Sequence, residues 1–241
     1  MITANSSDIE LFASSLFHIS KKLYICNSFN KKLPDMNKKL FLLICMAACL
    51  QLGHAQNTME SIRQRYTEAK KYIESHQGTQ DNDGSDWGEY YHMEARLFLP
   101  ATGGHKEDVY MYWNEREEDV VYPSHYLTFA TSKYNYAARN FYDEYLFDED
   151  GKVAFVYVYD PLTSISDDEP DMEYEFRFYL NKGKLIKAIV KRRADDQQPF
   201  TEVYSGTSLK NRLSTVYDQY VTKAECIRKM FIAIEEEAYG N

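Results

Sequence analysis

The sequence contains none of the short motifs that mark the common enzyme classes. It has no GxSxG nucleophile elbow, no HExxH metal-binding helix, no phosphate-binding glycine loop and no CxxC pair. These absences weaken an enzymatic interpretation, and no cofactor is expected. They do not exclude an enzyme, because the paired carboxylates of a glycosidase need no local motif.

Cysteine is also scarce. Three of the four cysteines, Cys26, Cys45 and Cys49, lie near the N-terminus, so removal of that segment would leave Cys226 alone. An intramolecular disulfide would then be impossible, and the stability of the protein must come from its core. We interpret Cys226 as an unreactive helix residue, since no partner for a thiolate stands near it in the sequence.

Basic residues are outnumbered, with 28 Lys and Arg against 37 Asp and Glu and a formal net charge of -9. The first 55 residues carry six lysines and three carboxylates, so the chain that follows them has a net charge of -12. Such an acidic surface repels phosphate backbones and anionic lipids. We therefore expect neither a nucleic-acid partner nor a peripheral-membrane role.

Residues 36–55 have the pattern of a cleavable signal peptide. Lys38 and Lys39 supply a positive start, and Leu40 to Leu50 is an apolar run too short for a comfortable membrane span. Gly53 and Ala55 place small residues where signal peptidase requires them, so cleavage is predicted between Ala55 and Gln56. This segment resembles the signal peptides of exported proteins of Bacteroides-type bacteria, a resemblance that implies no function.

Two alternatives concern the same N-terminal region. Residues 1–35 precede the signal and show no clear period, so we expect translation to begin at Met36, with a long n-region as the alternative. Met46 to Cys49 is an imperfect lipobox, so lipid anchoring at Cys49 is the alternative to a free exported protein. The mature chain itself is expected to have no transmembrane segment.

The remaining sequence predicts one α+β domain over residues 56–241. Its composition favours sheet, because 15% of residues are aromatic and 21 of them are Tyr. Apolar residues at three- and four-residue steps predict a helix over Asn57 to Gln77 and a long helix over Ser208 to Ala238. Between them, period-two alternation and turn residues predict about seven antiparallel strands: Glu89 to Leu97, Asp108 to Glu115, Tyr126 to Ser132, Asn140 to Phe147, Val153 to Tyr159, Met172 to Leu180 and Leu185 to Lys191.

The arrangement expected from these elements is a meander sheet with both helices packed on one face. The opposite face would then carry many of the tyrosines. An open curved sheet and a nearly closed barrel are both compatible with the pattern.

Three segments contain residue types that serve in metal binding or catalysis. Asp81, Asp83 and Asp86 lie in a polar loop that resembles part of a calcium loop, although a solvated linker explains them better. His92, Glu94 and Arg96 share one strand face and would present a base, an acid and a cation side by side, or form an ordinary exposed face. The acidic segment 167–171 is interpreted as a solvated loop.

Tyrosine is the strongest remaining signal for a binding surface. A Tyr ring stacks on sugars or peptides while its hydroxyl forms hydrogen bonds. The candidate ligand-binding residues lie at predicted strand positions and are Tyr110, Tyr112, Tyr126, Tyr157 and Tyr179. The alternative is that a second layer, or the C-terminal helix, covers them.

These observations predict that the protein is an exported, non-enzymatic binding module of the bacterial envelope. Its partner would be a glycan, a small molecule or a protein. The alternative is a hydrolase of an envelope or dietary polymer that uses carboxylates such as Glu94 as acid or base.

Overall fold

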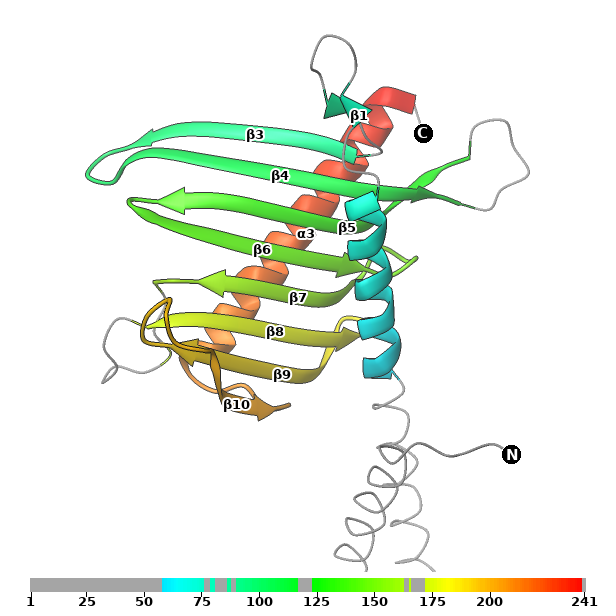
Figure 1. The fold of residues 1–241 in the computed structure, drawn as a ribbon. Coiled ribbons are helices and arrows are strands. Elements are labelled where there is room, and N and C mark those ends of the chain that lie inside the picture. Colours follow the sequence, from blue (N-terminus) through cyan, green and yellow to red (C-terminus); the bar gives the residue numbers. More distant parts are fainter. Residues whose placement is uncertain are drawn as a thin grey trace, which may run out of the picture. The chain divides into compact units, whose positions relative to one another are not determined.

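The computed structural model describes residues 58–75, 79–80, 86–87, 90–116, 123–162, 165 and 172–239. In chain order the elements are a helix at residues 58–75, here called the N-terminal helix, then β1 (Thr79–Gln80), β2 (Asp86–Trp87), β3 (Tyr90–Leu99), β4 (Gly103–Glu115), β5 (His125–Tyr136), β6 (Arg139–Phe147), β7 (Val153–Asp160), β8 (Glu173–Asn181), β9 (Lys184–Arg193), β10 (Thr201–Gly206) and α3 (Arg212–Tyr239). Figure 1 shows one large twisted sheet crossed by the two helices.

The large sheet is an eight-stranded antiparallel meander. Its strand order, from β10 through β9, β8, β7, β6, β5 and β4 to β3, means that each strand pairs only with its neighbours in the chain. Because β3 and β10 are its two edges, the sheet is open and is not a barrel. The predicted α+β meander is thus confirmed, and the barrel alternative is wrong.

The strand of the large sheet that the sequence prediction missed is β10, at the edge; the short strands β1 and β2, which pair with each other, were also not predicted. Its side chains are mostly exposed, and Val203 is 40% accessible to solvent. An edge strand with little apolar burial lacks the alternation by which the other strands are recognised. The sheet therefore has one strand more than predicted.

Two hairpin turns show why some boundaries differ from the prediction. Lys182 and Gly183 join β8 to β9 with φ angles of 50° and 76°, the positive values of a two-residue type I′ turn. The turn between β5 and β6 also contains a positive φ, 52° at Ala137, although an alanine gives no turn signal in the sequence. For that reason β5 continues to Tyr136, beyond its predicted end.

The two helices lie on opposite faces of the sheet (Figure 1). One side of α3 is buried against one face through Leu213, Val216, Tyr220, Ala224, Ile227 and Phe231. The N-terminal helix buries Ile62 and Ile73 against the other face, where they meet Phe129, Leu146 and Phe155. The expectation that both helices share one face is wrong. An apolar stripe predicts that one side of a helix is buried, but it does not predict which face of the sheet the helix packs on when both faces are apolar.

Candidate functional site

The strand register gathers aromatic residues on the face that contacts the N-terminal helix. Directly paired residues of antiparallel strands point to the same face. A first row across the sheet runs Tyr90, Tyr112, Phe129, Leu146, Phe155 and Tyr179. A second, more polar row runs His92, Tyr110, Thr131, Glu144, Tyr157 and Arg177. The predicted clustering of tyrosines on one face is therefore present.

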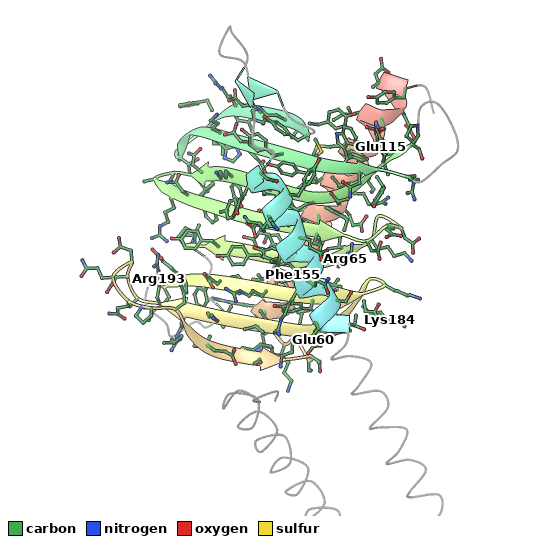
Figure 2. The ribbon with its side chains drawn as sticks, turned by 45° about the vertical axis from the view of Figure 1, so that its right-hand side comes forward. Glu60, Arg65, Glu115, Phe155, Lys184 and Arg193 are labelled. Atoms are coloured by element: carbon green, nitrogen blue, oxygen red, sulfur yellow. The ribbon has the colours of Figure 1, made fainter. Side chains whose placement is uncertain are left out.

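The N-terminal helix packs on the first row and leaves cavities beside its contact line. The ring of Tyr66 meets Phe155 edge to face, with centroids 5.1 Å apart, and Phe155 in turn lies 4.9 Å from Tyr179. Figure 2 shows Phe155 on the sheet beside the helix that carries Glu60 and Arg65. This aromatic packing holds the helix at a fixed position over the sheet.

The larger pocket, of about 580 Å³, lies between this helix and strands β6, β7 and β8. Its lining residues are Ile62, Arg63, Tyr66, Thr67, Tyr142, Glu144, Phe155, Tyr157, Arg177 and Tyr179. Ligand pockets commonly measure about 300–1,000 Å³ and combine apolar walls with a few placed polar groups. The larger pocket has both properties.

A buried carboxylate organises the base of this pocket. Glu144 is only 2% exposed, and Tyr66 donates a short hydrogen bond to its Oε2. Its Oε1 accepts hydrogen bonds from the Tyr142 hydroxyl at 2.6 Å and from Lys70 Nζ at 2.7 Å. The ammonium group compensates the buried charge, and the carboxylate in return fixes two tyrosine rings in the pocket wall.

Three tyrosines of the larger pocket, Tyr66, Tyr142 and Tyr157, have a raised pKa and remain protonated at physiological pH. Burial, reinforced by the adjacent Glu144 carboxylate, raises the pKa of Tyr66 and of Tyr142 well above the usual value for a phenol. Burial and Glu175 do the same to the pKa of Tyr157, whose hydroxyl donates to Glu175 Oε1 at 3.1 Å. These hydroxyls therefore act as neutral hydrogen-bond donors.

Two arginines border the larger pocket, and they differ in whether a described carboxylate forms an ion pair with them. Arg177 forms an ion pair with Glu175 at 2.9 Å, and its guanidinium lies 5.7 Å from the centre of the Tyr157 ring. The guanidinium of Arg63 lies 5.6 Å from the centre of the Tyr179 ring. Within the described part of the chain, no carboxylate forms an ion pair with Arg63.

The smaller pocket, of about 310 Å³, lies beside the other end of the same helix. Tyr112 and Tyr126 line it, and Arg116 lies 5.2 Å from the centre of the Tyr126 ring. Burial raises the pKa of Tyr112 to about 12, and its ring packs against the cluster under the helix. Part of the tyrosine face is therefore covered, but by the N-terminal helix and not by the C-terminal helix that the alternative interpretation named.

The five tyrosines predicted to bind ligand do not form a single surface. Tyr157 and Tyr179 line the larger pocket, and Tyr112 and Tyr126 line the smaller one. Tyr110 lines neither of these two pockets and stacks on His92, with ring centroids 4.3 Å apart and planes 7° from parallel. Their role in ligand binding stays a prediction. Four of these tyrosines are shared between two separate pockets, and Tyr110 lines neither of them.

The predicted triplet on β3 forms an exposed network of ion pairs. Glu94 contacts Arg96 at 2.5 Å and Lys106 at 3.0 Å, while His92 contacts Asp108 at 3.1 Å. Hydrogen bonds from Arg96 and Lys106 lower the pKa of Glu94. A general acid at neutral pH needs a raised pKa, so this environment does not support the catalytic role considered for Glu94.

The carboxylates that line the larger pocket give no support to the hydrolase alternative at that site. Glycosidases place two carboxyl groups about 5 to 9.5 Å apart across the substrate. Among the described residues that line the larger pocket, Glu144 is the one carboxylate, and both of its oxygens already accept hydrogen bonds.

Several predicted residues lie where the structure gives no side-chain detail. Asp81, Asp83 and the signal-peptide residues, with Cys49, Ala55 and Gln56, are outside the described residues, and Asp86 is in β2, which pairs with β1. No group of three or more His, Cys, Asp or Glu side chains suited to a metal ion occurs in the described ranges. Cys226 is exposed on α3.

No described helix has both the length and the apolar character needed to cross a bilayer. Comparisons with protein-family models, curated proteins and solved structures gave no match to this chain.

Proposed function

We propose that this protein is an exported, non-enzymatic binding module that holds a small molecule or glycan in the larger pocket. The observation that carries the proposal is the cavity of about 580 Å³ whose aromatic walls are fixed by the buried Glu144. Rigid aromatic walls gain apolar contact on binding at a small cost in conformational entropy. The hydroxyls and guanidinium groups at the border of the pocket would orient the ligand through hydrogen bonds.

The hydrogen bonds that fix its walls favour the interpretation of the larger pocket as a binding site over its interpretation as an incidental gap between helix and sheet. Tyr66 and Tyr142 approach Glu144 from the helix and from the sheet, so one carboxylate joins the two walls. Lys70 adds a third contact to the same carboxylate from the helix. A preformed cavity of this kind avoids the ordering cost that weakens binding to mobile surfaces.

Replacement of Tyr157 by Ala should weaken ligand binding by about 1 to 3 kcal/mol, the usual effect of removing an aromatic anchor. Ligands would first be recovered by thermal-shift screening of glycans and small molecules, and affinities measured by calorimetry. Tyr136→Ala is the matched control, because this tyrosine is 44% exposed and lies outside the larger pocket. Equal affinities of the two variants, with both folded, would contradict the proposed site.

Export is the second part of the proposal and is supported by the signal-like residues 36–55. We expect the protein isolated from its native host to begin at Gln56 and to carry no lipid. Intact-mass spectrometry measures both properties at once. An acylated species beginning at Cys49 would instead establish lipid anchoring, and a retained N-terminal segment would remove the support for cleavage.

A further inference from the structure

We propose that the larger pocket selects an organic anion with a ring-containing body, and that Arg63 binds its charged group. This inference rests on the proposed function and concerns the chemistry of the ligand. It depends on the balance of charges around the pocket, on the position of Arg63, and on the shape of the aromatic walls.

As far as the structure describes the surrounding residues, one positive group that lines the larger pocket has no ion-pair partner. Glu144 is compensated by Lys70 at 2.7 Å, and Arg177 is compensated by Glu175 at 2.9 Å. Arg63 forms no ion pair with any described residue. The pocket therefore has a local excess of one positive charge, in a chain whose formal net charge is -9.

A cationic ligand is disfavoured by the same contacts. The carboxylate of Glu144 would be its natural partner, but Glu144 already accepts three hydrogen bonds and is 2% exposed. A cation would have to displace Lys70 or the tyrosine hydroxyls, and it would meet Arg63 and Arg177 at the border. An anion needs no such displacement.

Arg63 is placed to hold an anionic group at the border of the aromatic cavity. It is an exposed residue of the N-terminal helix, and its guanidinium lies 5.6 Å from the centre of the Tyr179 ring, a cation–π contact that favours this position at the border. A guanidinium presents paired N–H donors whose geometry matches a carboxylate, sulfonate or phosphate group. Both the charge and the donor geometry of Arg63 therefore suit an oxyanion.

The walls of the larger pocket suit a ring system attached to that oxyanion. Tyr142 and Tyr157 lie 6.4 Å apart with their planes at 62°, and Phe155 and Tyr179 form a second pair at 4.9 Å. Tilted rings of this kind offer both faces and edges to a flat or saturated ring. A volume of about 580 Å³ accommodates a ligand of one to a few rings.

Two fluorescent probes that share a ring system and differ in charge test the proposal. Anilinonaphthalene sulfonate carries one negative charge, and N-phenylnaphthylamine is its neutral counterpart. Affinities for both would be measured by fluorescence titration of the full chain and of three variants. Arg63→Gln removes the proposed anion contact, Tyr157→Ala removes a wall, and Lys71→Gln removes an exposed positive charge of the same helix that does not line the pocket.

The expected result is that Arg63→Gln weakens binding of the sulfonate about tenfold, as loss of a hydrogen bond to a charged group commonly does. The same variant should leave the neutral probe unchanged, Lys71→Gln should leave both unchanged, and Tyr157→Ala should weaken both. Melting temperatures of the variants would verify that each is folded.

Two other results would overturn the proposal in distinguishable ways. If Tyr157→Ala weakens both probes but Arg63→Gln affects neither, the pocket binds ligands and the anion selectivity is wrong. If Tyr157→Ala affects neither probe in a folded protein, the larger pocket is not the binding site and the proposed function fails with it.

Discussion

A chain that ends at Tyr204 should not unfold cooperatively, because it lacks α3 and the apolar packing of that helix on one face of the sheet. The buried side of α3 includes Leu213, Ile227 and Phe231, each 7% exposed or less. Truncation of one such side chain to Ala costs about 2 to 5 kcal/mol. Since the whole stability of a domain is about 5 to 15 kcal/mol, loss of the entire helix exceeds it.

Calorimetry and circular dichroism would measure this effect, and two isoleucines on α3 supply a matched pair of point variants. Ile227 is 2% exposed and Ile232 is 37% exposed. Ile227→Ala should lower the free energy of unfolding by about 2 to 5 kcal/mol, and Ile232→Ala should change it by less than about 0.5 kcal/mol. Cooperative melting of the truncated chain near the full-length temperature would show that the sheet does not depend on α3.

Replacement of Lys223 by Met should destabilise the protein by about 3 to 5 kcal/mol near neutral pH, the usual cost of leaving a buried charge unpaired. Lys223 Nζ lies 2.7 Å from Asp143 Oδ2 and 3.0 Å from Glu107, and it donates to Ser132 Oγ at 2.9 Å. Asp143 is fully buried, and its Oδ1 has no hydrogen-bond partner among the described residues. The lysine is thus the only cation paired with this carboxylate in the described ranges.

The loss caused by Lys223→Met should depend on pH in a defined direction. Burial raises the pKa of Asp143 to about 6, although Lys223 and the Tyr145 hydroxyl lower it and Glu107 adds to the rise. A raised folded-state pKa contributes stability that is present below the unfolded value and is lost as pH rises through the folded value. Removal of Lys223 raises the pKa of Asp143 further, so the variant should lose most at about pH 7.5 and much less at about pH 4.5.

Urea denaturation of the variant and the unmodified protein at both pH values would measure this difference. Lys229→Met is the matched control, since Lys229 is an exposed lysine of the same helix. Addition of Asp143→Asn to Lys223→Met should restore much of the lost stability at neutral pH, because no buried charge then remains on residue 143. An equal loss at both pH values would show that Lys223 acts through packing alone.

The sheet could be predicted from sequence because its strands alternate clearly and most of its hairpins contain recognisable turns. Asn181 to Lys184 illustrates this, since Gly183 provides a positive φ at the predicted turn. The segment Thr201–Gly206 illustrates the limit, because an exposed edge strand buries too little to leave a periodic pattern. Local periodicity therefore identified the central strands and missed one edge.

The candidate site was predictable only in part, because it depends on contacts between distant segments. Tyr157 and Tyr179 were recognised as aromatic residues at strand positions, and both line the larger pocket. The role of Glu144 arises from Tyr66 and Lys70, which lie 78 and 74 residues away in the sequence. The position of Glu144 within the aromatic strand Asn140 to Phe147 indicates a buried carboxylate. Its partners cannot be identified from the sequence, because they depend on where the N-terminal helix packs.

The most direct test of the larger pocket as a binding site is a crystal structure of the protein with anilinonaphthalene sulfonate bound. The account predicts that the rings lie against Tyr157 and Tyr179, with the sulfonate oxygens about 3 Å from the Arg63 guanidinium. A probe bound instead at an exposed apolar residue such as Phe98, which is 81% exposed, with the larger pocket free of probe, would contradict it.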